Sequence, residues 1–173
     1  MFSLNVPVPG ALARLAADLH PQLVGFDSRR EQHTLVVKRF DESMLRADQP
    51  EVQLATLQQQ LPGDLAGTPA FEAEVRAVDY FAEPARGEGP VVYLAVESPG
   101  LRQLHEKLVD AYGAVEGLEG LDYVPHVTLA RGGSAADAER VAGGVGPVSW
   151  TVSELVIWDS RYREKVSRYS LPA

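Results

Sequence analysis

Segments with two different apolar periods alternate along this chain, and their order constrains the fold more than any other feature of the sequence. Apolar residues recur at every second position in runs typical of strands, and at every third or fourth position in runs typical of amphipathic helices. We predict strands at residues 2–8, within 29–40, and at 69–81, 91–96, 124–130, 148–158 and 166–171, and helices at 11–23, 52–61, 99–112 and 134–141. Loops include 83–90, a glycine-rich break at 143–147 and a polar, solvated turn at 159–165. This order defines an α+β fold.

The composition fits one globular domain that spans residues 1–173. Of these 173 residues, 45% are hydrophobic and 23% are charged, which is enough for a substantial core. The chain has no cysteine, which excludes a disulfide framework, a thiolate zinc site and a cysteine nucleophile, and favours a reducing, cytoplasmic location. The chain shows no leader-like N-terminal segment and no apolar run that approaches a bilayer span, so we expect neither export nor membrane insertion.

The formal net charge of -8 and the sequence pI near 5.0 limit the possible partners. Sequence-independent binding to duplex nucleic acid requires a basic face, which this balance disfavours. A nucleotide or an RNA terminus needs only a local cluster of cations. Local charge is therefore more informative than the total.

The stretch from Tyr123 to Arg131 contains the strongest candidates for chemistry. In a strand, His126 and Thr128 point to the same face, roughly 7 Å apart along the backbone, so that one small anion can contact both. Pro125 lacks an amide donor and suits the mouth of a strand. Arg131 adds a fixed cation at the strand exit. The stretch therefore combines a proton-transfer group, a hydroxyl donor and a guanidinium.

The segment Pro125–Arg131 resembles the second signature of the 2H phosphoesterases, a group that includes 2'-5' RNA ligases and RNA cyclic phosphodiesterases. Members carry His-x-Thr-x twice, on two pseudo-symmetric halves of one domain. The resemblance implies a bilobal α+β domain whose interleaved lobes hold two antiparallel sheets around a central cleft, with helices outside. It also implies a second copy of the signature in the first third of the chain.

The place for that copy is the run from Arg29 to Phe40, where a charged approach leads into a β-branched segment. The family pattern puts Thr two residues after His, whereas Thr34 directly follows His33. In a regular strand these side chains point to opposite faces, so both reach one site only through a bulge or an irregular entry. Alternatively, Thr34 keeps the hydroxyl position and Gln32 stands where the histidine would be, which replaces a titrating group with an amide. We favour His33, the one imidazole near this run.

Two cations leave the same run on opposite faces. Alternation from His33 would bring Arg39 to the site, and alternation from Thr34 would bring Lys38. The sequence does not choose between the two. We predict that Lys38 flanks the site and binds substrate together with Arg131.

The resemblance implies metal-independent cleavage of an RNA 2',3'-cyclic phosphate to a 2'-phosphate, with joining through a 2'-5' linkage as the reverse reaction. One imidazole would deprotonate water while the other, as imidazolium, protonates the leaving ribose oxygen. Hydroxyls and cations would hold the non-bridging oxygens. We therefore expect a monomeric enzyme that acts on RNA ends or small cyclic nucleotides. The predicted catalytic residues are His33, His126, Thr34 and Thr128, and the predicted substrate-binding residues are Lys38 and Arg131.

Other chemistries find less support in the sequence. No His-x-His, His-Glu-x-x-His or clustered carboxylate spacing indicates a metal site, and no Gly-rich loop ends in Gly-Lys-Ser or Gly-Lys-Thr. We therefore expect no metal, no cofactor and no ATP-dependent ligation. His105 lies on the apolar stripe of a helix, which favours a structural role. The irregular first run supports one alternative function, a module that binds RNA ends or nucleotides without turnover.

Overall fold

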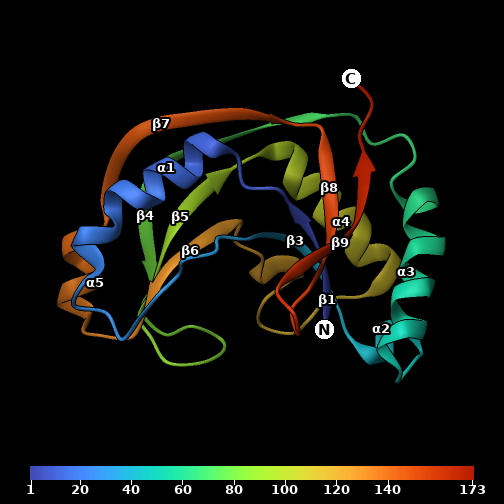
Figure 1. Ribbon diagram of the computed structural model, residues 1–173, viewed down its shortest axis with the longest axis horizontal. Coiled ribbons are helices and arrows are strands. Elements are labelled where there is room, and N and C mark those ends of the chain that lie inside the picture. Colours follow the sequence, from blue (N-terminus) through green and yellow to red (C-terminus); the bar gives the residue numbers. More distant parts are fainter.

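The computed structural model describes residues 1–173 and has the predicted α+β architecture (Figure 1). Its strands are β1 (Phe2–Val6), β2 (Ser28–Arg29), β3 (Leu35–Phe40), β4 (Phe71–Phe81), β5 (Val91–Glu97), β6 (His126–Arg131), β7 (Gly143–Val152), β8 (Glu154–Asp159) and β9 (Glu164–Ser170). Its α-helices are α1 (Gly10–Leu19), α2 (Glu42–Leu45), α3 (Pro50–Asp64), α4 (Pro99–Tyr112) and α5 (Ala135–Val141), and its 3-10 turns are η1 (His20–Leu23) and η2 (Gly120–Asp122). None of these helices combines the length and the apolarity needed to cross a bilayer.

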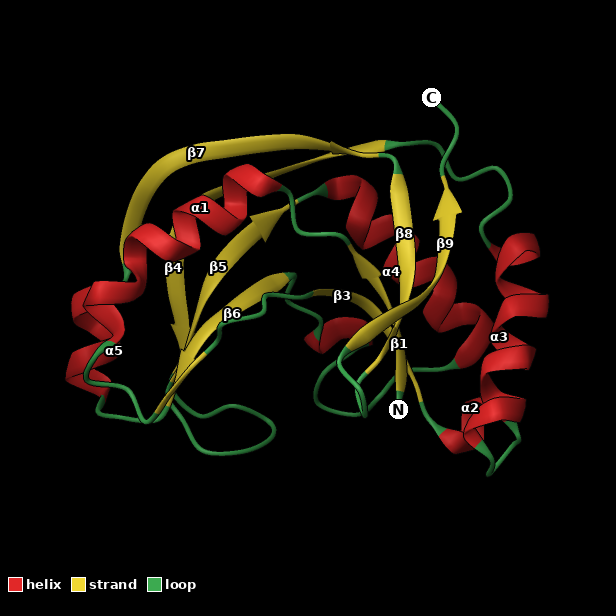
Figure 2. Ribbon diagram, in the orientation of Figure 1, coloured by secondary structure: helices red, strands yellow, loops and turns green.

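The strands form an antiparallel sheet in the order β7-β4-β5-β6-β3-β1-β8-β9, with β2 beside β6. We call β4 to β7 the β6 half, and β1, β3, β8 and β9 the β3 half (Figure 2). The pair Leu35 and Val127 is the one register pair between β3 and β6. The two antiparallel sheets that the family resemblance implied are thus joined at a narrow seam into one sheet.

Helix α4 holds the two halves together, because it packs against β3 of one half and β4 of the other. Its buried residues Leu101, Leu104 and Leu108 recur at three and four positions, which places them on one face. The Ser98 hydroxyl caps the helix by accepting a hydrogen bond from the Leu101 amide at 3.1 Å. Truncating a buried leucine of this kind costs about 2–5 kcal/mol of stability.

The predicted glycine-rich break at 143–147 is instead the first half of β7. Strand β7 lies at the edge of the sheet and pairs only with β4. The register pairs Val75–Val148 and Ala77–Gly144 are separated by one residue on β4 but by three residues, 145–147, on β7. This segment of β7 therefore bulges. An edge bulge tolerates Pro147, which has no amide to donate, and this explains why the turn-like composition did not end the strand.

Candidate active site

A cavity of about 550 Å³ lies between the two halves, where β3 and β6 meet. Side chains from both strands line it, together with the loop after β4, the segment that contains η2, and the tip of the β8–β9 hairpin. The structure brings four of the six predicted site residues to this cavity, and these are Thr34, His126, Thr128 and Arg131. It does not bring His33 or Lys38 there.

His126 begins β6 and has its tautomer set by the backbone. Its Nδ1 lies 2.6 Å from the Val124 carbonyl oxygen. A carbonyl only accepts, so Nδ1 carries the proton and Nε2 keeps its lone pair. The rings of Phe81 and Tyr93 both meet the imidazole edge to face, at centroid distances of 5.3 Å. These contacts hold the ring in a fixed orientation.

The surroundings of His126 favour its neutral form. Burial lowers the pKa of His126, and the charges of Arg39 and Arg131 lower it further, against the opposing effect of the hydrogen bond to Val124. The imidazole is therefore neutral at pH 7, with an unprotonated Nε2. A neutral imidazole suits a base better than an acid.

A bulge in β6 brings Arg131 to the face that His126 and Thr128 share. Val92 of β5 pairs with Ala130 and Tyr93 pairs with Thr128, so Leu129 is an extra residue that shifts the alternation by one. Ala130 is consequently buried instead of facing the site. The Arg131 guanidinium is held by the carbonyl oxygens of Arg86, at 2.7 Å, and Glu88, at 3.3 Å.

Residues 31–34 bulge out of the sheet before β3 begins. The Arg30 amide donates to the Leu129 carbonyl of β6 at 2.8 Å, and Leu35 pairs with Val127. Four residues therefore span a distance that β6 covers with one. This is the irregular entry that the close spacing of the imidazole and the hydroxyl required.

The bulge directs Gln32 and Thr34 into the cavity, while His33 does not line it. Burial lowers the pKa of His33, and the charges of His20 and then of Arg30 lower it further. The cavity therefore differs from the choice of His33, because the bulge brings its neighbours Gln32 and Thr34 to the lining and not His33 itself. The alternative, with Gln32 in the histidine position, agrees with the observed cavity.

Lys38, which we predicted to bind substrate, does not line this cavity. Strand β3 carries one extra residue, Val37, because Leu4 and Asn5 of β1 pair with Lys38 and Val36. This bulge moves Lys38 away from the face of Thr34 and brings Arg39 to the cavity in its place. The Lys38 side chain is 0% exposed.

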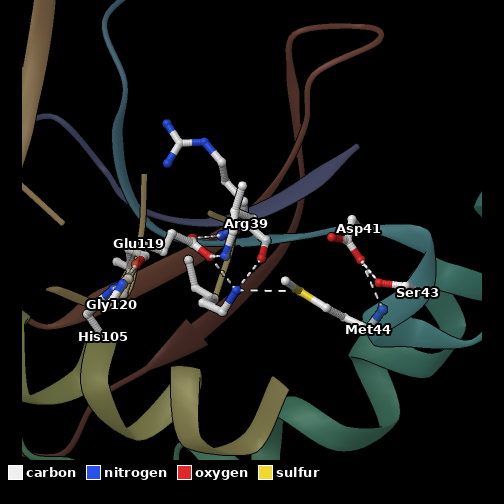
Figure 3. A network of polar contacts seen from close by, with 10 residues as sticks. Arg39, Asp41, Ser43, Met44, His105, Glu119 and Gly120 are labelled. Carbon is white, nitrogen blue, oxygen red and sulfur yellow. Dashed lines mark hydrogen bonds and ion pairs between the residues drawn. The ribbon is translucent and has the colours of Figure 1, made fainter. Parts of the chain in front are cut away.

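A buried carboxylate supports the backbone next to Arg39 (Figure 3). Glu119, whose side chain is 1% exposed, accepts hydrogen bonds from Lys38 Nζ at 2.6 Å and from the amides of Arg39, at 2.7 Å, and Val115, at 3.0 Å. Burial lowers the pKa of Lys38, and the hydrogen bond and charge of Glu119 oppose that change. The Arg39 guanidinium extends away from this network and lines the cavity.

His105 borders the cavity but has no ring nitrogen available for chemistry. The Gly120 amide donates to its Nε2 at 3.0 Å, so its proton is on Nδ1, which donates to the Val37 carbonyl at 2.7 Å. The ring stacks on Tyr123 with a centroid distance of 3.7 Å. His105 is 2% exposed, and it supports the segment around η2 as the structural residue that the sequence indicated.

Sequence reasoning missed Arg30, Arg86 and Arg163 as residues of the cavity, and it named Arg39 only as the alternative to Lys38. Arg163 lies in the turn that we predicted to be solvated, but its Nε donates to the Gln32 side-chain oxygen at 3.3 Å. The Gln32 amide nitrogen donates back to the Arg163 carbonyl at 3.4 Å. This contact spans 131 residues of sequence, so no local pattern reports it. No group of three or more His, Asp or Glu side chains is arranged to hold a metal ion.

Comparisons with known proteins agree with this architecture. The family model of the 2'-5' RNA ligase superfamily matches residues 34–164. The fold is similar to that of TT0787 from Thermus thermophilus, with a TM-score of 0.65 and 22% identity over 98% of this chain and 97% of that one. It is also similar to E. coli LigT complexed with 3'-AMP, with a TM-score of 0.67 and 17% identity over 99% and 98%.

A further solved structure, of a phosphoesterase, has a TM-score of 0.54 and 18% identity over 99% of this chain and 98% of that one. A search of curated sequences finds no significant match. Because the family model covers most of the chain, the protein belongs to the 2'-5' RNA ligase superfamily, within the 2H phosphoesterases. The resemblance first noted at Pro125–Arg131 is confirmed at this level.

Proposed function

We propose that this protein hydrolyses 2',3'-cyclic phosphodiesters of RNA ends or small nucleotides to 2'-phosphates without a metal, with His126 as the base. One observation carries the proposal. The unprotonated Nε2 of His126 belongs to the same cavity as two threonine hydroxyls and two guanidinium groups, from Arg39 and Arg131. This combination suits a small phosphate ester with a neighbouring water.

In the proposed reaction, His126 Nε2 takes a proton from the water that attacks phosphorus. The hydroxyls of Thr34 and Thr128 donate to non-bridging oxygens, and Arg39 and Arg131 offset the charge that develops on them. The P–O3' bond breaks and leaves the phosphate on O2'. Relief of strain in the five-membered ring favours this step.

The expected second imidazole is replaced by Gln32, whose amide does not titrate. The leaving ribose oxygen must then take its proton from solvent. Positioned acid catalysis is worth about 10²–10⁴-fold in rate. We therefore expect slow hydrolysis. We propose 2'-5' joining only as the related reaction in which a 5'-hydroxyl attacks the cyclic phosphate in place of water and the P–O3' bond breaks.

The test is hydrolysis of adenosine 2',3'-cyclic phosphate in the presence of EDTA by wild type, His126→Ala and His33→Ala. We expect turnover by wild type, a loss of about 100-fold or more in His126→Ala, and a rate within about twofold of wild type in His33→Ala, which serves as the matched control. Turnover that survives in His126→Ala contradicts the proposal.

A second candidate is a module that binds phosphate-terminated nucleotides without turnover, and the presence of Gln32 in the cavity favours it. The same assay separates the two functions. Binding of the cyclic nucleotide by calorimetry, together with no hydrolysis by wild type over hours, would identify the module. Binding with slow, His126-dependent hydrolysis would identify the enzyme.

A further inference from the structure

The cavity concentrates positive charge in a protein whose net charge is -8. Five arginines line it, and these are Arg30, Arg39, Arg86, Arg131 and Arg163. None of the five takes part in the ion pairs of the structure, all of which join other cations to carboxylates. Glu119 is committed to Lys38, which leaves Glu83 and Asp122 as the other carboxylates at the lining. The excess of guanidinium groups suits a ligand that carries more than one phosphate group.

Four of these arginines can be placed by the charges that act between neighbouring groups. Arg39 and Arg131 lie close enough to His126 to lower its pKa. Arg163 and Arg131 act on Arg30, whose pKa is lowered by burial first and then by these two charges. Arg131 therefore lies between the proposed hydrolytic centre and a second pair, Arg30 and Arg163. Like charges gathered at one site repel one another until an anion binds between them.

The fold holds the backbone of Arg30 and the side chain of Arg163 near the cavity. Arg30 follows β2, and its amide is bonded to the Leu129 carbonyl of β6. Arg163 has a left-handed backbone conformation, with φ of 54°, and its side chain and carbonyl both bond to Gln32 at 3.3 and 3.4 Å. The residue in the position expected for the first histidine thus holds Arg163 at the cavity. Trp158, which also lines the cavity, belongs to the same hairpin.

We propose that Arg30 and Arg163 form a second phosphate subsite, so that the ligand is an RNA strand end bound through two phosphates. The terminal phosphate lies at His126, and the phosphodiester on the 5' side of the same nucleotide lies between the two guanidinium groups. Guanidinium groups bind phosphate oxygens through paired N–H donors, which suits this role. The position of the first phosphate rests on the proposed function.

The test compares the affinities of two nucleotides that contain no cyclic phosphate, so that neither is hydrolysed by the proposed reaction. Adenosine 3',5'-bisphosphate carries both phosphates of such a strand end, and 3'-AMP carries one. We expect calorimetry at fixed, low salt to give an affinity of wild type for the bisphosphate at least about tenfold higher than for 3'-AMP. In Arg163→Gln and in Arg30→Gln, this ratio should fall to about one. Lys165→Gln removes a neighbouring cation outside the cavity and should keep the wild-type ratio.

Two results would overturn the subsite. One is an equal affinity of wild type for the two nucleotides, or binding of neither. The other is a wild-type ratio that survives in both arginine variants. The hydrolysis assay tests the proposed function separately from this binding measurement. A strong preference for the bisphosphate with no turnover of the cyclic nucleotide would support the subsite and refute the hydrolase.

Discussion

β6 and β3 are neighbours in the sheet, and β6, like β3 with the residues just before it, brings a hydroxyl and an arginine to the same cavity. Only β6 also brings an imidazole. In β6, His126 and Thr128 follow regular strand alternation. Before β3, four residues bulge out, and Gln32 lines the cavity while His33 does not. The two halves therefore present strands of similar geometry to the cavity, but one places an imidazole there and the other an amide.

Beyond Thr128 and Thr34, β6 and β3 have similar bulges and similar side-chain directions. Each has one extra residue, Leu129 in β6 and Val37 in β3, and an arginine at the cavity two residues later. The residue before that arginine is buried in both strands, as Ala130 and as Lys38. The β3 half therefore accommodates a buried charge where the β6 half has a methyl group, and it does so through Glu119.

The largest expected effect comes from making the two halves chemically alike. His126→Gln would put an amide on each side of the cavity, and we expect hydrolysis of a 2',3'-cyclic nucleotide to fall by about 10²–10⁴-fold, because the base is lost. Steady-state rates with EDTA measure the loss. His33→Gln is the matched control outside the cavity, and an equal loss in that variant would return His33 to the mechanism.

The buried charge of the β3 half offers the next largest effect. Lys38→Met leaves Glu119 buried without its cation, and we expect the free energy of unfolding to fall by about 3–5 kcal/mol. Urea denaturation at pH 7 measures this change. Lys107→Met, at an exposed position on α4, provides the control. A change below about 1 kcal/mol in Lys38→Met would show that the pair does not support the strand.

A converse substitution would give the β3 half the group that it lacks. We expect Gln32→His to raise the hydrolysis rate by up to about 10²-fold, since an imidazolium in this position can protonate the leaving oxygen. The pH profile should then become bell-shaped. The same change breaks the contact with Arg163, so the affinity for the bisphosphate should decrease. An unchanged rate and profile would show that this position does not reach the leaving group.

The smallest effect concerns stability and pH. Burial lowers the pKa of His105 in the folded protein. At pH values below the ordinary histidine pKa of about 6.5, the unfolded chain therefore binds more protons at this residue than the folded protein does. Stability should therefore be complete above that value and decrease as the pH falls toward the folded pKa. Urea denaturation at about pH 5.5 and 7.5 should show a smaller decrease in His105→Gln than in wild type. An identical decrease would assign the effect to other groups.

The sequence alone predicted the β6 half of the site better than the β3 half, and the reason is physical. His126 and Thr128 lie in a regular strand, where the period of two determines which side chains share a face. The positions of Gln32, His33, Lys38 and Arg39 depend on bulges set by pairing with β1 and β6, which the local pattern does not contain. Arg163 reaches the cavity through tertiary contact alone.

The central claim is that a single neutral imidazole, that of His126, titrates in the reaction. Its most direct test is the pH dependence of kcat/KM for a 2',3'-cyclic nucleotide with EDTA, from about pH 5 to pH 9. Because burial, Arg39 and Arg131 lower the pKa of His126, we predict that kcat/KM rises through one ionisation below about pH 6.5 and stays level above it. A bell-shaped profile in wild type, or one unchanged by His126→Ala, would contradict the account.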